Sequence, residues 1–322
     1  LYQKAVFNVG DFSFGSIHGY DRYGEGKQCK LSSFICVSGG RLSVTGENKL
    51  EYPASIGITV NGNGWYKNYV EHGGHWLADR GTYVWRVEDK ALIETPGVYL
   101  AVNYDSTTGR IEVAGGRFHI KSSIGGNGLS DKNRGASVVL DGGVLDCDFS
   151  KNTAFTGSKS NQTSYFHLCV GVNGGRIRNR NGNILTIDNN GFMNKPGVAE
   201  PGVLTIDGYG KFYFNQAAQG AFTGRTKIRG YVHSDMSTCP LGTGDIEIAD
   251  GGILYTSGKA VNNSVTYSGA SYIWTDNATG CMTIPSLTQK DDGILILRST
   301  ASRTVYGTEA DSRYLCVETA PE

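Results

Sequence analysis

The feature that most constrains the fold of this chain is a short unit that recurs seven times. Each copy has an alternating apolar strand, a small or Asx residue, a pair of glycines and a second alternating strand. The copies are FICVSGGRLSV, YVEHGGHWLA, RIEVAGGRFHI, VVLDGGVLDCDF, CVGVNGGRIRN, LTIDGYGKFYF and IEIADGGILYT. The second residue after the glycines, here called the marker residue, is apolar in every copy, as a strand with one buried face requires. The marker residues are Leu42, Trp76, Phe118, Leu145, Ile177, Phe212 and Leu254, spaced 27 to 42 residues apart. A recurring unit with insertions of irregular length indicates a repeat architecture.

The glycine pairs predict sharp corners between strands. In four copies an Asx residue precedes the glycine, and both residue types tolerate a left-handed backbone. The same chemistry fits a two-residue hairpin turn, which would give a sandwich or a propeller of about seven blades. We favour a parallel solenoid, because the marker residues are uniformly apolar, the repeat lengths are irregular, and no Trp-Asp signature closes each unit. We therefore expect the corners to lie one above another, so that the seven marker residues form one continuous internal file.

The expected organisation is all-β, with one solenoid between two irregular caps. Residues 31–258 hold the repeats, and residues 259–322 remain strand-like without the glycine pair, as degenerate rungs and a C-terminal cap would be. Residues 1–30 are predicted to cover the open edge of the first rung or to donate a strand to a neighbouring molecule. No segment shows a sustained 3.6-residue period, so we expect very little helix.

Composition excludes several classes of function. The 322 residues include 30 basic and 30 acidic side chains, so the formal net charge is zero and neither nucleic acid nor an anionic membrane is an expected partner. The aliphatic runs are too short to span a bilayer, so we expect no membrane insertion. The chain begins without Met and without an apolar leader, which is the expectation for a processed or trimmed form.

The seven cysteines form no CxxC pair, which argues against zinc or thioredoxin-like chemistry. Cys147 lies on the inward face of its strand and is predicted to be a small core residue. The remaining expectations are a clip between Cys29 and Cys36, and pairing among Cys239, Cys281 and Cys316.

Alignment of the repeats on their glycines places opposite charges on neighbouring rungs. The two resulting triplets are His119–Asp146–Arg178 and Lys121–Asp148–Arg180, and the outward column that holds Asp146 also contains Tyr213 and Tyr255. The simpler interpretation is a charge ladder that fixes the stacking register, because opposite charges on adjacent strands attract.

The alternative interpretation of these charges is a catalytic groove. Asp146 and Asp148 would lie about 6.5–7 Å apart along one strand, near the lower limit for the carboxyl pair of an inverting glycosidase. Lys121, Arg178 and Arg180 would instead bind a uronate carboxylate, with one basic group removing the α-proton for elimination. The candidate catalytic residues are therefore Asp146, Asp148, Lys121, Arg178 and Arg180.

Aromatic residues concentrate between Trp65 and Trp85. Packing inside a wide rung is the simpler explanation, and a platform on which sugars stack is the functional one. The candidate stacking residues are Trp65, Tyr66, Trp76 and Trp85.

Metal and cofactor signatures are weak. The two histidines of Glu71-His72-x-x-His75 straddle a glycine corner instead of sharing a helical face. Asp105 and Asp291-Asp292 lack the nonapeptide run of calcium-binding solenoids. We expect neither a metal nor a cofactor.

The segments LGTGDIEIADGGILYTSG and GVLTIDGYGKFYFN resemble right-handed parallel β-helix (pectin-lyase-like) proteins, most of all the strand repeats of bacterial autotransporter passengers. The resemblance covers residues 31–258. It implies a secreted or cell-surface protein with a structural, adhesive or fibre-forming role, whose partners are other copies of itself or a polysaccharide. Pectate lyases and polygalacturonases share this fold, but the Asn-Thr-Asp, Asp-Asp and Gly-His-Gly motifs of polygalacturonases are absent in their expected order, as is the calcium and arginine signature of pectate lyases. A non-enzymatic role is therefore the leading hypothesis, and a carbohydrate-active enzyme or a glycan-binding module is the alternative.

Overall fold

The structure, a computed structural model, describes the strands of the chain and most of the corners between them. The described residues are 11–14, 33–44, 56–68, 75–76, 82–99, 108–122, 124–126, 136–157, 166–187, 190–214, 219–257, 260–275, 282–299 and 315–319.

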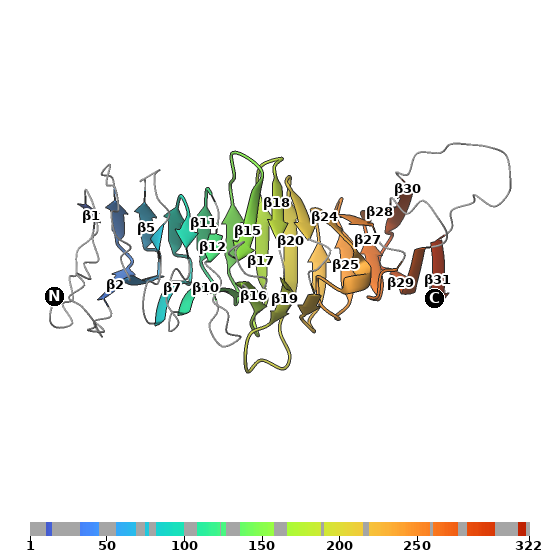
Figure 1. Cartoon of the computed structure of the whole chain (residues 1–322), viewed down its shortest axis with the longest axis horizontal. Coiled ribbons are helices and arrows are strands. Elements are labelled where there is room, and N and C mark those ends of the chain that lie inside the picture. The colour runs from blue at the N-terminus through green and yellow to red at the C-terminus, as the bar shows by residue number, and fades with distance from the viewer. Residues whose placement is uncertain are drawn as a thin grey trace. The chain divides into compact units, whose positions relative to one another are not determined.

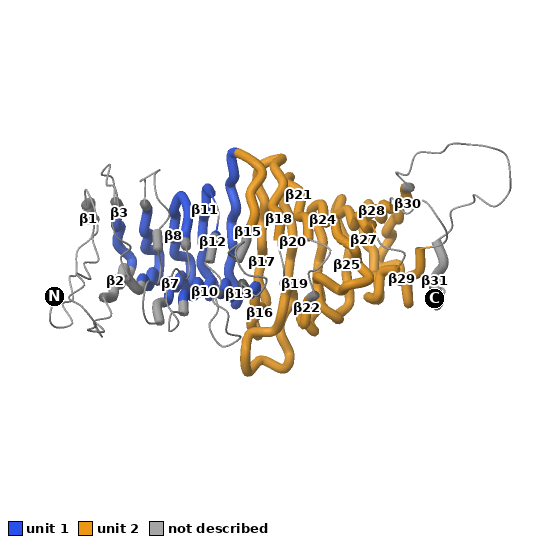
Figure 2. The backbone as a smooth tube through the Cα atoms, viewed as in Figure 1, with its two compact units in different colours: residues 1–150, 155–168 blue, residues 151–154, 169–322 orange. Residues whose placement is uncertain are grey.

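The chain forms two compact units, each built from parallel strands (Figures 1 and 2). Unit 1 comprises residues 1–150 and 155–168, and unit 2 comprises residues 151–154 and 169–322. Two strands, β15 (Thr153–Gly157) and β16 (Phe166–Val170), contain the division between the units. Strands of three sheets, called sheets 1, 2 and 3, occur in both units.

From β4 (Ile56–Asn61) onward, the described strands of unit 1 follow the order sheet 2, sheet 1, sheet 3 and repeat it. Sheet 1 contains β1 (Asp11–Phe14), β3 (Arg41–Val44), β5 (Trp65–Asn68), β8 (Leu92–Thr95), β11 (Arg117–Ile120) and β14 (Val144–Cys147). Sheet 2 contains β2 (Ser33–Ser38), β4 (Ile56–Asn61), β7 (Thr82–Glu88), β10 (Thr108–Ala114) and β13 (Ala136–Leu140). Sheet 3 contains β6 (His75–Trp76), β9 (Val98–Tyr99) and β12 (Ile124–Gly126).

In unit 2 the last described strand of sheet 2 is β22 (Gln219–Ala221), whereas sheets 1 and 3 continue to later strands. Sheet 1 contains β17 (Gly175–Asn179), β20 (Leu204–Gly208), β23 (Thr226–Ile228), β25 (Ile246–Ala249), β27 (Val265–Ser268), β29 (Met282–Gln289) and β31 (Leu315–Thr319). Among the described residues, the strands of sheet 2 that lie wholly in this unit are β19 (Asn190–Asn194) and β22 (Gln219–Ala221). Sheet 3 contains β18 (Ile184–Ile187), β21 (Lys211–Phe214), β24 (Tyr231–Ser234), β26 (Ile253–Thr256), β28 (Ala270–Thr275) and β30 (Ile294–Ser299).

The predicted parallel solenoid is confirmed, and the hairpin alternative is wrong. The strands on either side of a glycine pair lie in different sheets, as β13 and β14 do around Gly142 and Gly143. Each strand pairs in parallel with strands one turn away, so that β11 pairs with β8 and β14. Helix is limited, among the described residues, to one 3-10 turn, η1 (Met236–Thr238).

The expectation that all seven marker residues share one file is wrong. In unit 1, Leu42 and Phe118 lie on sheet 1, whereas Trp76 lies on sheet 3. In unit 2, Ile177 lies on sheet 1, whereas Phe212 lies on sheet 3. The corner that leads into sheet 1 and the corner that leads into sheet 3 impose similar backbone demands, so the same glycine pair occurs at both.

Each unit does contain a continuous internal file, but the file also includes residues that are not marker residues. In unit 1 the sheet 1 file is Leu42, Tyr66, Ile93, Phe118 and Leu145. In unit 2 the sheet 3 file is Leu185, Phe212, Val232, Leu254, Ile273 and Leu297. All of these side chains except Leu297 are buried. Stacked apolar layers of this kind supply the main favourable term in the folding of a solenoid.

Corners without a glycine pair explain why the repeat count missed several turns. At the corner before β8, Asp89 adopts φ +52°. Its carboxylate accepts a hydrogen bond of 2.9 Å from the backbone N–H of Gly62, one turn earlier. Asp291 adopts φ +55° at the corner before β30, where a single glycine, Gly293, follows. Asx residues therefore take the left-handed position at these corners, as their chemistry predicts.

The cysteine and terminal predictions have mixed outcomes. Cys147 is fully buried as predicted, and Cys147 and Cys239 are free thiols. Because Cys239 is free, its predicted pairing with Cys281 or Cys316 is wrong. Cys29 and Cys281 lie outside the described residues, so the Cys29–Cys36 clip and a Cys281–Cys316 pair stay predictions. Within residues 1–30 the structure describes only β1, which pairs with β3 of the same chain.

Candidate functional site

A charge ladder lies on sheet 1 in unit 1, and its centre is Glu94 on β8, which the repeat alignment did not include. The Glu94 carboxylate lies 2.8 Å from Nζ of Lys121, 3.5 Å from Nδ1 of His119 and 3.7 Å from Nζ of Lys67. Burial alone would raise the pKa of this carboxyl group, but the hydrogen bond and charge of Lys121, with the charges of His119 and Lys67, outweigh burial and lower the pKa. Glu94 is therefore ionised at neutral pH and acts as a hydrogen-bond acceptor.

The two candidate catalytic aspartates belong to the same ladder. Asp146 faces His119 in the parallel register, as the repeat alignment predicts. Its side chain is fully buried, and its carboxylate lies 3.9 Å from a guanidinium nitrogen of Arg117. The Asp148 carboxylate lies 3.3 Å from Nε2 of His119. Each aspartate thus has a basic neighbour on β11.

The other two candidates, Arg178 and Arg180, belong to unit 2. Arg178 faces Asp207 of β20 in the register, and its Nε lies 3.6 Å from that carboxylate. Arg176 also pairs with Asp207. The five candidates thus divide between the units, and four of them (Lys121, Asp146, Asp148 and Arg178) have ion-pair partners inside their own unit.

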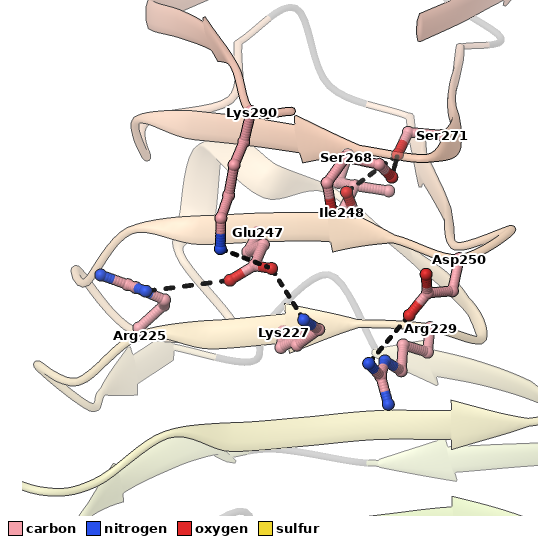
Figure 3. A network of polar contacts seen from close by, with 9 residues as sticks. All are labelled: Arg225, Lys227, Arg229, Glu247, Ile248, Asp250, Ser268, Ser271 and Lys290. Carbon is pink, nitrogen blue, oxygen red and sulfur yellow. Dashed lines mark hydrogen bonds and ion pairs between the residues drawn. The ribbon is translucent and has the colours of Figure 1, made fainter. Parts of the chain in front are cut away.

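A second cluster on sheet 1 of unit 2 was not predicted, and Figure 3 shows it in close view. The buried carboxylate of Glu247 on β25 accepts a hydrogen bond of 2.8 Å from Nζ of Lys227, and it lies 3.8 Å from Arg225 and 4.0 Å from Lys290. Burial would raise the pKa of Glu247, but the hydrogen bond from Lys227 and the three positive charges lower it. The cluster repeats the arrangement around Glu94, with one buried carboxylate among several basic side chains.

Repetition of this pattern on both units favours the structural interpretation of the charges. At Glu94, Asp207 and Glu247 each carboxylate lies among basic groups on neighbouring strands, which fixes the register of the turns. Inverting hydrolysis needs one protonated and one ionised carboxyl group, whereas the pKa of Glu94 and that of Glu247 are lowered.

Two of the four predicted stacking residues lie in the core and cannot offer a face to a sugar. Tyr66 and Trp85 are 1% and 3% exposed, and their rings contact each other edge to face at 5.9 Å. Burial raises the pKa of the Tyr66 hydroxyl. Trp65 is half-buried and lies near the cations of Lys67 and Arg41. Trp76 belongs to β6, and its side chain lies outside the described residues.

A larger group of aromatic side chains lies on the outer surface of sheet 3 in unit 2. This aromatic face consists of Tyr213, Tyr231, His233, Tyr255, Tyr272 and Trp274. All six are half-buried, whereas the residues between them on the strands, such as Val232, Leu254 and Ile273, point inward and are buried. Strand alternation therefore separates a buried core from an aromatic surface on the same strands.

The aromatic face is continuous across four strands. Tyr213, His233, Tyr255 and Trp274 occupy one column of the register on β21, β24, β26 and β28. Ring centroids are 4.9 Å apart between Tyr213 and His233 and 4.1 Å apart between His233 and Tyr255. Tyr231, in the adjacent column, lies 5.9 Å from Trp274. The rings meet mostly at steep angles, which leaves both edges and faces at the surface.

Two cations border the aromatic face. Nζ of Lys211 lies 5.1 Å from the ring centroid of Tyr231, and the guanidinium of Arg298 lies 5.0 Å from the ring centroid of Trp274. A guanidinium held over a ring keeps its in-plane N–H donors available to a ligand.

Sequence reasoning found only part of this face. Tyr213 and Tyr255 follow a glycine pair and appear in the outward column of the repeat alignment. His233 and Trp274 lie on strands that no glycine pair precedes. The available signal was the alternation of aromatic and aliphatic residues in YVHS and SYIWT, which matches that of KFYF and ILYT.

The remaining predictions concern metals and membranes. The part of the chain that the structure describes contains no group of three or more metal-ligating side chains. Glu71 and His72 lie outside that part, so the weak histidine motif stays untested. Within the same described ranges, no helical segment has the length and hydropathy that crossing a bilayer demands.

No family model, no curated protein and no solved structure matches this chain.

Proposed function

We propose that this chain is a non-catalytic, secreted or cell-surface β-solenoid that adheres to polysaccharide through the aromatic face of unit 2. The observation that carries the proposal is the run of half-buried rings from Tyr213 to Trp274 along one column of sheet 3. Aromatic side chains offer flat apolar surfaces to the C–H groups of pyranose rings, and tyrosine hydroxyls add hydrogen bonds at the edges.

The spacing of the rings favours an extended chain over a single sugar. Strands of neighbouring turns are about 4.8 Å apart, so successive rings in the column repeat at a distance comparable with the length of one sugar residue. A polysaccharide that runs along the column contacts several rings at once. Lys211 and Arg298 extend the surface at its margins and can pair with carboxylate or sulfate groups where the polysaccharide carries them.

The ion-pair clusters support a role without catalysis. Glu94 and Glu247 are buried among basic side chains and carry lowered pKa values, which suits a structural acceptor better than a proton donor. The solenoid then serves as a rigid support that presents the aromatic face, which is how sites on repeat proteins commonly work.

The proposal is tested by measuring binding and turnover on the same set of polysaccharides. The full chain is titrated with neutral and acidic polysaccharides by calorimetry, and each mixture is assayed for soluble products. We expect saturable binding without turnover, and loss of one ring in Tyr255→Ala or Trp274→Ala should raise Kd roughly 2- to 10-fold.

Trp65→Ala is the matched control, because Trp65 is another half-buried tryptophan beside basic side chains, but in unit 1. Weaker binding by Trp65→Ala, with Tyr255→Ala and Trp274→Ala unchanged, would place the site elsewhere. Release of products that stops in Asp146→Asn or Asp148→Asn would replace the proposal with a carbohydrate-active enzyme.

A further inference from the structure

The last strand of sheet 3 in unit 2 has an open edge in the described part of the chain. β30 pairs along its whole length with β28, from Ala270–Ile294 to Thr275–Ser299 (Figure 1). It stands at the end of the strand order of its sheet, and no strand among the described residues pairs with its other side. Within the described ranges, one row of backbone N–H and C=O groups on β30 therefore has no strand partner and can pair with a further strand.

The side chains of β30 are unusually apolar for such an edge. Ile294, Ile296 and Leu297 are 64%, 42% and 49% exposed. Leu297 continues the inward file, and the preceding member of that file, Ile273, is only 1% exposed. Leu297 thus lies at the end of the core on the inner side of the strand. Ile294 and Ile296 form an apolar surface on its outer side.

The sequence of β30 lacks most features that prevent natural edge strands from pairing with other chains. Such strands are commonly short, contain a bulge or a proline, or carry several lysines. β30 has six residues, ILILRS, with no proline and a single charge at Arg298. An edge of this kind is suited to pairing with another strand.

We infer that β30 pairs in antiparallel fashion with β30 of a second copy of this chain. A two-fold axis through Ile296 places Ile296 opposite Ile296, Leu295 opposite Leu297 and Ile294 opposite Arg298, so every apolar residue meets an apolar residue or the aliphatic stem of arginine. Parallel pairing in register would instead place Arg298 beside Arg298, which is unfavourable. The strand is therefore self-complementary in one orientation.

This pairing has a consequence for the surface described above. In an antiparallel pair, directly opposite residues point to the same side of the sheet. Ile296 shares its side of the sheet with Tyr272, its register partner on β28. The dimer therefore presents two aromatic faces on one side of a combined sheet.

A charge-swap experiment tests the pairing. Sedimentation velocity of the full chain should show a reversible monomer–dimer equilibrium. Ile296→Lys and Ile296→Glu each place like charges opposite one another on the two-fold axis, and each should raise the dimer Kd at least about 10-fold. An equimolar mixture of the two variants should restore dimers, because Lys then faces Glu.

Val203→Lys is the control, because Val203 is 44% exposed and lies outside β30; its dimer Kd should match that of the unmodified chain. An unmodified chain that is monomeric at all concentrations would overturn the inference, as would an Ile296→Lys protein that dimerises normally or a mixture that stays monomeric. The affinity of one aromatic face for polysaccharide should be equal in the Ile296→Lys monomer and in the dimer. The dimerisation test can therefore fail without affecting the proposed function, and the reverse also holds.

Discussion

At the scale of single residues, the two glycines of a corner perform different tasks. Gly142 adopts φ +97°, a conformation that side chains with Cβ rarely take. Gly143 instead lies where a Cβ atom would come within 2.5 Å of the carbonyl oxygen of Gly116 and 2.6 Å of Val113. The first glycine is needed for backbone conformation, and the second is needed for contact with the previous turn.

The close contact at Gly143 makes a prediction about stability. Gly143→Ala should lower the free energy of unfolding by about 1–3 kcal/mol, because the Gly116 carbonyl is backbone and cannot turn aside. Gly182→Ala is the control, since nothing lies within 4 Å of the added Cβ there, and it should be neutral or slightly stabilising. Urea unfolding of both variants measures the difference, and equal stability of the two would remove the steric explanation.

A buried amide closes a corner of unit 2. Asn179 is fully buried, and its Nδ2 donates to the carbonyl oxygens of Asn183 at 2.9 Å and Lys211 at 3.3 Å. Asn179→Ala leaves both acceptors without this donor and should cost about 2–3 kcal/mol of stability. Asn262→Ala, which removes a single exposed hydrogen bond to Ser237, should cost less than about 1 kcal/mol, and urea unfolding of both variants measures the two losses. A similar loss in both variants would mean that burial of the Asn179 amide is unimportant.

At the scale of elements, the sequence predicted the type of strand contact better than its position. The apolar marker Phe118 and the outward pair His119 and Asp146 lie as the alignment of glycines requires, because both follow corners of the same kind. Glu94 was missed because its strand follows Asp89, which takes the left-handed position without a glycine pair. One-dimensional spacing cannot distinguish a corner into sheet 1 from one into sheet 3, and it cannot detect a corner that uses Asp.

The charged clusters predict that acid weakens unit 2. The pKa of Glu247 is lower in the folded chain than its ordinary value of 4.5, so its contribution to stability is complete above that value and disappears as the pH falls through the folded pKa. Glu247→Gln should therefore reduce the free energy of unfolding by about 1–3 kcal/mol at pH 7. The difference from the unmodified chain should shrink below about pH 4.5.

Thermal unfolding at a series of pH values from 7 down to 3 measures this difference. Asp250→Asn is the control, because Asp250 is 59% exposed and its 2.8 Å pair with Arg229 is a surface ion pair. That variant should change stability by less than about 1 kcal/mol. If the free energy of unfolding of Glu247→Gln differed from that of the unmodified chain by the same amount at every pH, ionisation of Glu247 would not stabilise the fold.

At the scale of the whole molecule, stability should be local. In the described part of the chain, each strand pairs with strands one turn before or one turn after it, as β8 does with β5 and β11. In such an architecture the free energy is approximately a sum of terms for turns and for the interfaces between neighbouring turns. Gly143→Ala should therefore increase hydrogen exchange most in β11 and β14 and leave hydrogen exchange in β25 to β29 unchanged.

Hydrogen exchange followed by mass spectrometry of peptides resolves these segments. A uniform loss of protection along the chain would show that it unfolds as one cooperative unit, and that the additive description of a solenoid does not apply to it.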